Sequence, residues 1–406
     1  MQALKILLAS LLALFVLVPV TGLRAERLPV VSSARLGLHP DQTRLVLEMD
    51  SRLPYKIFTL ADPFRVVIDF PEISWQVPQE RMRKSVGLVS GFRFGLFQPG
   101  NSRVVVDVNA PVAIASHFLL EPKGKKPYRF VLDLKAVDRD AFFAGTRSVE
   151  SAGWSKRIQS AKRPEPSPKP PRGGDTRRVI VLDPGHGGVD PGTIGVSGSY
   201  EKDITLAVAQ AAKRVLESAG RYRVILTRTH DVYIRLRDRF EVAHDNDAEL
   251  FISLHADSIA SHKIRGGSVY TLSDTASDKE AEDLAQKENK SDIIAGADLT
   301  GYASEVSRVL IDLAQSDTNR ESYYLARMLV GELKKNIKLL RTSHRYAGFA
   351  VLKSPNVPSA LIELGYLSNR IDERNLTNPK YRSAIGQAIL RAVDRYFERK
   401  DLNNRS

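Results

Sequence analysis

Short stretches of alternating polar and apolar residues dominate residues 30–134. A period of two residues is typical of half-buried β-strands, and few segments here have the 3.6-residue period of a helix. The pattern also occurs twice. Thr-Arg-Leu-Val-Leu-Glu and Pro-Phe-Arg-Val-Val-Ile-Asp, at residues 43–48 and 63–69, correspond to Ser-Arg-Val-Val-Val-Asp and Pro-Tyr-Arg-Phe-Val-Leu-Asp, at residues 102–107 and 127–133. Such a duplication predicts two similar small sheets packed face to face, an all-β sandwich at residues 29–135.

The pattern changes in residues 177–400, where apolar strands alternate with helical periods. We expect strands at residues 178–182, 224–227, 250–254, 268–272, 349–352 and 360–363. We expect helices at residues 204–219, 236–246, 321–340 and 379–399. This alternation predicts an α/β domain with a mostly parallel sheet flanked by helices. Ligands of such domains bind at the carboxyl ends of the strands.

Two segments outside these patterns have other roles. Residues 136–176 lose periodicity and are dense in Pro, Lys, Arg and Gly from residue 164 to 174, which predicts a basic, extended linker.

The first 25 residues combine Lys5 with an apolar run and a break at Pro19, which is typical of a secretory signal peptide cut after Ala25. A membrane anchor is the alternative, but the run is shorter than the roughly 20 residues that a spanning helix needs. We therefore expect an exported protein that does not span the membrane after leader removal.

Composition narrows the partners and the metal chemistry. The 406 residues are too many for one ordinary core, which agrees with two domains. The formal net charge of +13 would suit a nucleic-acid partner, but export leaves anionic wall polymers and membrane surfaces instead. Because the chain has no cysteine, any zinc site must use histidine and carboxylate ligands.

Four residues of the metal-binding and acid–base types lie at strand ends or helix starts of the second domain. His186 follows the first strand within Asp-Pro-Gly-His-Gly-Gly, and Glu201 precedes the first helix. His255 ends a strand in Ser-Leu-His-Ala-Asp, and Glu363 ends the last strand in Leu-Ile-Glu-Leu-Gly. Two histidines and a carboxylate match a catalytic zinc site with its fourth position open. Taken singly, each residue has a simpler interpretation, such as a surface histidine or a carboxylate that complements a helix dipole.

These motifs resemble the Amidase_3 family of N-acetylmuramoyl-L-alanine amidases, and the duplicated strands resemble the AMIN domain. The resemblance implies that His186, Glu201 and His255 bind Zn²⁺ and that Glu363 is the catalytic carboxylate. It implies hydrolysis of the amide between N-acetylmuramic acid and L-alanine in peptidoglycan, and a sandwich that targets the wall. It also implies a periplasmic, septal site of action in daughter-cell separation.

An insertion at about residues 273–318 is far longer than a normal connection. Residues 279–294 have helical periodicity, with Ala281, Leu284 and Ala285 on one side. In the septum-acting amidases that the sequence resembles, such an insertion covers the zinc until an activator, a LytM-type protein, removes it. By that resemblance Glu288 would cap the metal, with Asp292 one turn later on the same face. The alternative is a solvated acidic helix.

Two other functions stay open from the residues alone. A zinc peptidase could cut within the stem peptide, although the chain has no His-Glu-x-x-His motif. A wall-binding scaffold with a silent hydrolase domain is the second alternative. The intact set of His186, Glu201, His255 and Glu363 argues against it, since a silent domain has no chemical need to keep them. Arg345 is a further residue to consider, either as a contact for a substrate carboxylate or, more simply, in a surface ion pair.

Overall fold

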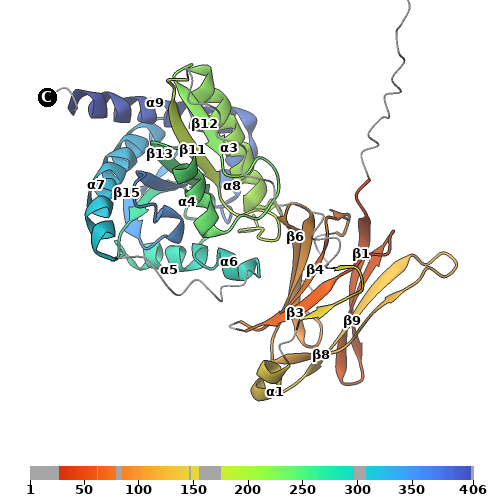
Figure 1. The fold of residues 1–406 in the computed structure, drawn as a ribbon. Helices are drawn as coiled ribbons and strands as arrows, with labels where there is room; N and C mark the ends of the chain where they lie inside the picture. Colours follow the sequence, from red (N-terminus) through yellow and green to blue (C-terminus); the bar gives the residue numbers. More distant parts are fainter. Residues whose placement is uncertain are drawn as a thin grey trace, which may run out of the picture.

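The computed structural model describes two bodies, a β-sandwich and an α/β domain (Figure 1). The described residues are 27–61, 63–78, 85–145, 148–154, 175–296 and 308–403, with the backbone alone at 144 and 308–316. The predicted signal peptide and the basic stretch at 164–174 therefore lie outside the described residues. Residues 297–307 of the predicted insertion lie outside them as well.

Two five-stranded sheets form the sandwich. One has the order β5-β1-β2-β9-β8 and the other β10-β3-β4-β7-β6. The strands of the first sheet are β5 (Ser74–Trp75), β1 (Val30–His39), β2 (Gln42–Met49), β9 (Tyr128–Ala136) and β8 (Val112–Leu120). Those of the second are β10 (Val149–Glu150), β3 (Lys56–Leu60), β4 (Arg65–Pro71), β7 (Asn101–Val108) and β6 (Val89–Gln98).

The sequence duplication corresponds to a pseudo-twofold exchange of strands between these sheets. β2 of the first copy pairs with β9 of the second, and β7 of the second copy pairs with β4 of the first. Inward-facing Val, Leu, Ile and Phe side chains of both sheets fill one core, as expected from strands with a period of two. The sandwich continues past residue 135, because α1 (Arg139–Ala144) and β10 lie in the segment that was expected to be linker, and β10 pairs with β3.

The α/β domain contains a six-stranded sheet of order β12-β11-β13-β16-β14-β15. Its pairings are parallel except for β14 with β16, which confirms the prediction of a mostly parallel sheet. The strands are β11 (Arg178–Pro184), β12 (Tyr222–Leu226), β13 (Leu250–His255), β14 (Gly267–Leu272), β15 (Leu339–Ala347) and β16 (Ser359–Glu363).

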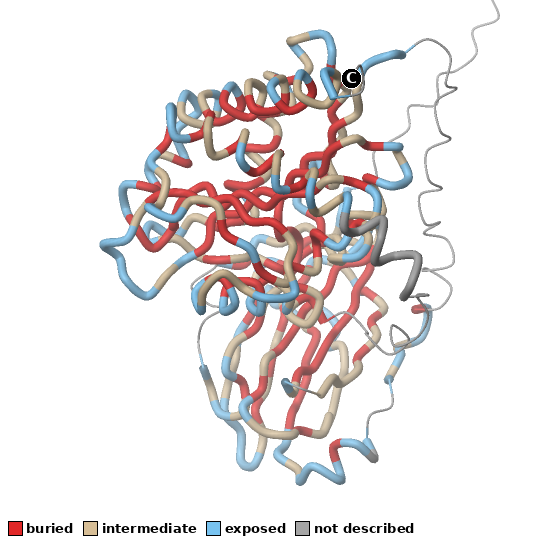
Figure 2. Tube along the Cα trace, turned by 90° about the vertical axis from the view of Figure 1, so that its left-hand side faces the viewer, coloured by how far each residue is buried: buried red, intermediate tan, exposed pale blue. Residues whose placement is uncertain are grey.

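Helices cover both faces of this sheet, so its strands lie in the buried layer of Figure 2. One core lies under α3 (Glu201–Ser218), α7 (Arg308–Leu333), α8 (Arg370–Thr377) and α9 (Pro379–Asn403). The other lies under α4 (Leu236–Asp245), α5 (Lys279–Glu288) and the 3₁₀ turn η2 (Ala350–Leu352). The apolar side predicted for the insertion packs into this second core through Ala281, Leu284 and Ala285.

Three predicted elements differ from the structure. The helix expected at 321–340 spans Arg308–Leu333, and the strand expected at 349–352 is the turn η2. The strand β15 was missed because its residues are mostly polar on the exposed side and lack a long apolar run. The helix expected at 279–294 is interrupted after Glu288 and is followed by a separate four-residue helix, α6 (Ser291–Ile294).

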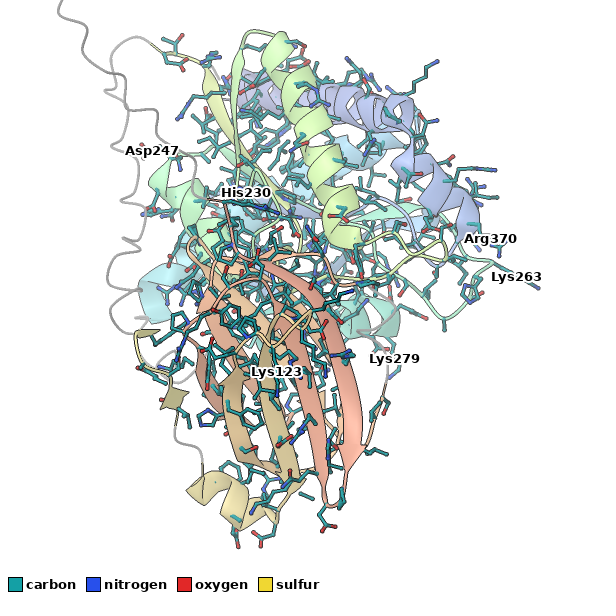
Figure 3. The ribbon with its side chains drawn as sticks, turned by 90° about the vertical axis from the view of Figure 1, so that its right-hand side faces the viewer. Lys123, His230, Asp247, Lys263, Lys279 and Arg370 are labelled. Carbon is teal, nitrogen blue, oxygen red and sulfur yellow. The ribbon has the colours of Figure 1, made fainter. Side chains whose placement is uncertain are left out.

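The two domains touch at α6 and the turn after it. Figure 1 shows both helices along the side of the α/β domain that faces the sandwich, with α6 nearest to β6. Lys279, labelled in Figure 3, begins α5 and points away from the body of the molecule. Away from these helices, the Tyr233 amide donates to the Leu96 carbonyl at 3.1 Å. Among the described residues no helix has the length and apolar character needed to cross a membrane.

Candidate metal centre

A strained loop after β11 positions His186. His186 has a φ of 61°, and Gly187 and Gly188 follow with φ of 128° and 57°. A non-glycine residue in this left-handed region costs about 1–2 kcal/mol, so the surrounding structure must hold it. The buried Arg239 does so, since it donates to the His186 carbonyl at 2.8 Å and pairs with Asp183 at 2.9 Å. Asp183 is thus a structural anchor of the loop.

Glu201 and His255 approach His186 from two other elements. Glu201 is the first residue of α3, and its Oε2 accepts from the Thr193 amide at 2.8 Å. Its Oε1 accepts from the Ala256 amide at 2.8 Å, which ties the carboxylate to the end of β13. His255 ends that strand and lies against Gly185, where an added Cβ would meet the imidazole ring at 2.4 Å. Only glycine leaves room for this ring.

The donor atoms of these residues have the spacing of ligands around one ion. Glu201 Oε1 lies 3.2 Å from His186 Nε2 and 3.3 Å from His255 Nδ1. Glu288 Oε2, from α5, lies 3.3 Å and 3.1 Å from the same two nitrogens. A tetrahedral zinc with ligands at about 2.0–2.1 Å has ligand–ligand edges of about 3.3–3.4 Å. Four of the six edges of such a tetrahedron are therefore present.

Unpaired buried atoms give a second test of the fit. His186 Nε2, His255 Nδ1, Glu288 Oε1 and Glu363 Oε1 are buried side-chain atoms without a hydrogen-bond partner. Buried polar atoms are nearly always satisfied. The two orphan imidazole nitrogens both lie within 3.3 Å of carboxylate oxygens of Glu201 and Glu288, which indicates a site for a cation between them. The two imidazole nitrogens and the carboxylates are the donor types that zinc prefers when thiolates are absent. The residues present fit a zinc ion.

Asp190 supports His186 from behind, and sequence reasoning missed it. Its Oδ2 lies 2.9 Å from His186 Nδ1, which leaves Nε2 as the free nitrogen. A carboxylate on the second ring nitrogen fixes the orientation of a metal-binding histidine and raises its basicity. The available signal was the position of Asp190 four residues after His186 in the same glycine-rich loop.

Glu363 lies beside the cluster without belonging to it. It ends β16 at the position that pairs with His255 on β13. One carboxylate oxygen accepts from the Asp257 amide at 3.0 Å, and the other has no partner. Burial raises the pKa of Glu363 well above its usual value. A carboxyl group with a raised pKa is suited to accept and return a proton.

Contacts of α5 and α6 close the site from the sandwich side. Lys287 forms a hydrogen-bonded ion pair with Asp257, and Ser291 donates to Asp190. Asp292, by contrast, does not reach the metal centre. It accepts from the Leu236 amide at 2.9 Å and from the Tyr233 hydroxyl, so it caps the start of α4. The prediction for Asp292 was wrong, because α5 ends at Glu288 and the Asp292 carboxylate, in α6, is engaged by Tyr233 and Leu236.

Arg345 holds the beginning of the same segment. Its guanidinium contacts both carboxylate oxygens of Asp278, at 2.9 Å for Nε, and Asp278 caps α5 through the Ala281 amide. The simpler expectation for Arg345, an ion pair, agrees with this contact, although the side chain is largely buried. In this arrangement the Arg345 side chain is engaged with α5.

Comparison with known proteins gives consistent matches for both domains. Residues 180–395 match the family Amidase_3, N-acetylmuramoyl-L-alanine amidase, and residues 34–132 match the AMIN domain. The chain is 33% identical to N-acetylmuramoyl-L-alanine amidase AmiC of Neisseria meningitidis serogroup B, over 95% of this chain and 94% of that protein. It is 31% identical to AmiC of Escherichia coli O6:H1, over 90% and 89%. The solved amidase AmiC2 of Nostoc punctiforme shows 26% identity and a TM-score of 0.42, over 55% of this chain and 99% of that one.

Proposed function

The chain belongs to the Amidase_3 family and is an N-acetylmuramoyl-L-alanine amidase, and we propose that it works with zinc held by His186, Glu201 and His255. The observation that carries the proposal is the spacing of 3.2 Å and 3.3 Å between the Glu201 oxygen and the two imidazole nitrogens. Peptidoglycan is the substrate. The bond that breaks joins the lactyl group of N-acetylmuramic acid to L-alanine.

Zinc, when bound, supplies Lewis acidity that makes a water acidic near neutral pH and polarises an amide oxygen. The residues of the chain do the rest. Asp190 keeps the His186 ring in one tautomer, and the Ala256 and Thr193 amides hold the Glu201 carboxylate in place. Glu363 takes the proton of the attacking water and passes it to the nitrogen of L-alanine as the C–N bond breaks. The products are a free lactyl carboxylate and a stem peptide with a free amine.

The described conformation is a closed one in this proposal. Residues 279–296, which comprise α5, α6 and the turn after them, form a lid. Glu288 of the lid lies 3.3 Å and 3.1 Å from the two imidazole nitrogens, so it would hold the fourth ligand position of a bound zinc, which a catalytic site must leave open. Lys287 also pairs with Asp257, and Ser291 donates to Asp190, so the lid engages two further carboxylates near the candidate ligands. Substrate can enter only after the lid moves, and an activator protein of LytM type would move it.

We propose that the sandwich and the leader bring the enzyme to peptidoglycan. We propose that the AMIN domain binds peptidoglycan, since wall targeting is the role of this domain in amidases. We further propose that the first 25 residues export the protein to the periplasm, and that it acts at the septum during daughter-cell separation. The formal charge of +13 favours contact with anionic wall polymers.

Metal analysis of the purified protein tests the central point. We expect one zinc per chain, loss of sacculus hydrolysis after chelation, and recovery when zinc is added back. The products, examined by mass spectrometry, should be intact stem peptides with a free L-alanine amine. A chain that keeps its activity after complete removal of metal, or products cut within the stem peptide, would contradict the proposal.

A deletion tests the lid. Removal of residues 279–314 should raise the basal rate of sacculus hydrolysis, because it removes Glu288 from the metal position. Circular dichroism and zinc content serve as controls for folding. If the folded deletion protein hydrolyses sacculi no faster than the full chain, the lid does not inhibit.

A further inference from the structure

The end of the lid lies on the outer face of the sandwich sheet that contains β4, β6 and β7. Three arginines of this face donate to four successive backbone carbonyls of the lid. Arg65 donates to Ile293, Arg93 donates to Ile294 at 2.8 Å, and Arg103 donates to Ala295 at 3.4 Å and to Gly296. We call Arg65, Arg93 and Arg103 the clasp.

These carbonyls need partners from outside the lid. The last four carbonyls of a helix receive no hydrogen bond from the N–H groups of the helix itself. This matters for α6, which has only four residues, Ser291–Ile294. Guanidinium groups satisfy several such carbonyls at once, because each presents a fork of donors. The Ile293 carbonyl also accepts from the Gly296 amide at 3.0 Å. Ala295 and Gly296 are buried, so the clasp supplies donors to carbonyls of a segment that is largely shielded from water.

Apolar contacts reinforce the clasp. Gly296 has a φ of 64°, and a Cβ there would lie 3.1 Å from Val67 and 3.3 Å from Val105, so the lid backbone sits directly on the sheet. Ala295 is fully buried in a small cluster with Val189 and Tyr233, against which Phe97 of the sandwich packs. Phe97 stacks on the Tyr233 ring at 5.6 Å and lies under the Arg103 guanidinium at 3.5 Å.

We infer that the sandwich holds the lid closed, so that the wall-targeting domain is also an inhibitor of the catalytic domain in the same chain. This inference rests on the proposed function of the lid and names its regulation. Ser291 and Ile293 are two residues apart, so the segment held by the clasp is continuous with the segment that reaches Asp190 at the metal centre. The lid cannot leave the metal as a whole while its last turn stays on the sandwich. Anything that pulls the sandwich away removes a part of the energy that closes the site.

The duplication in the sandwich supplies a matched control. Arg35, Arg44 and Arg129 occupy in the first sheet the positions of Arg93, Arg103 and Arg65 in the second. The registers are equivalent, since Arg44 pairs with Asp133 as Arg103 pairs with Asp69. Arg35 likewise forms an ion pair with Glu48, as Arg93 does with Asp107. No contact joins these three counterparts to the lid within the described parts of the chain.

The test compares two double variants of the full-length protein. Arg65→Ala/Arg93→Ala removes two of the donors and keeps the Arg103–Asp69 pair inside the sandwich, and Arg35→Ala/Arg129→Ala makes the equivalent change in the other sheet. We expect the first variant to hydrolyse purified sacculi about 5- to 150-fold faster than the wild type, the usual range of coupling between two sites. Hydrogen exchange of the backbone amides in residues 279–296 should increase in parallel. The counterpart variant should match the wild type in both measurements.

Two results would overturn the clasp. One is a clasp variant with wild-type hydrolysis and wild-type exchange in the lid, and the other is an equal change in the counterpart variant. Unchanged exchange in the strands of the sandwich shows that both variants are folded. Failure of the clasp is distinct from failure of the lid. If the deletion of residues 279–314 raises hydrolysis while the clasp variant changes nothing, the lid inhibits the enzyme but the clasp does not hold it. If the deletion changes nothing, exchange in the lid still decides whether the sandwich holds it.

Discussion

The two outer faces of the sandwich carry nearly the same residues and meet different surroundings. On one face Arg44 and Asp133 form a bidentate pair in which the arginine side chain is 31% exposed. On the other, Arg103 and Asp69 form the same pair at the same distances, and both side chains are 6% exposed. Along β2 the outward residues stay partly exposed, whereas along β7 they are buried from Asn101 to Val105 and only Asp107 is partly exposed. The end of the lid accounts for much of this difference.

The comparison separates what a sheet needs for its own stability from what it contributes to another domain. Both faces keep an arginine–carboxylate pair across the central strands, so this pair belongs to the architecture of the duplicated fold. Among the residues that the structure describes, only one face also donates to the carbonyls of a neighbouring segment. The same three arginine positions thus stabilise a sheet on one side, and on the other side they stabilise a conformation of the enzyme.

The largest effect is expected at the proposed active site, which the lid covers. Glu363→Gln keeps the size of the side chain but cannot accept the proton of water. We expect sacculus hydrolysis to fall about 10²- to 10⁴-fold, the usual contribution of a general base. Zinc content and binding to sacculi should stay unchanged, which excludes misfolding. A variant that hydrolyses at the wild-type rate would show that Glu363 is not the base. The lid on one face of the sandwich would then not cover the catalytic carboxylate.

Stability should differ between the two equivalent arginines. Arg103→Ala leaves Asp69 charged beneath the lid, and loss of one partner of a buried pair costs about 3–5 kcal/mol of unfolding free energy. Arg44→Ala should cost less than this, because the Arg44 side chain is already 31% exposed and Ser116 also donates to Asp133, which is itself 3% exposed, at 2.6 Å. Denaturant unfolding of the full chain measures both values. Equal losses would mean that the cover over the second face has no energetic consequence.

Once the lid carboxylate Glu288 is removed, arginine substitutions on either face of the sandwich should have similarly small effects on the rate of hydrolysis. Glu288→Ala opens the fourth ligand position, and we expect basal hydrolysis to rise about 5- to 150-fold. In this background the clasp substitutions Arg65→Ala and Arg93→Ala should add little, because both changes act on the same closed state. Rates of the single, double and triple variants on purified sacculi give the coupling. Fully additive effects would show that the clasp and Glu288 act independently.

The smallest effect should come from one methyl group at the edge of the clasp. Gly296→Ala places a Cβ 3.1 Å from Val67 at a φ of 64°, which should loosen the closed lid and raise hydrolysis up to about fivefold, the equivalent of 1 kcal/mol. Gly124→Ala is the control, since Gly124 has a φ of 61° in the hairpin of the other sheet with nothing within 4 Å of an added Cβ. The same backbone strain there should leave the rate unchanged. A rise in both variants would trace the effect to general loss of stability.

Much of the architecture and the metal-type residues followed from local patterns. The twofold repeat of alternating residues predicted two sheets, and the change of period predicted a mostly parallel α/β sheet. His186, Glu201, His255 and Glu363 were selected from strand ends and helix starts, and the structure brings them together. These predictions depend on near neighbours in the chain, because strand period, turn glycines and helix starts are set within a few residues.

Long-range contacts decided the rest. The break after Glu288 separates Glu288 at the metal centre from Asp292 at the start of α4, and no local period announced it. The duplicated arginines are alike in sequence, so the docking of the α/β domain makes one set a clasp and leaves the other partly exposed. The sequence determined which groups each domain presents, since side-chain chemistry and strand alternation are local. The tertiary structure determined which of them meet, since burial and pairing depend on segments more than two hundred residues away.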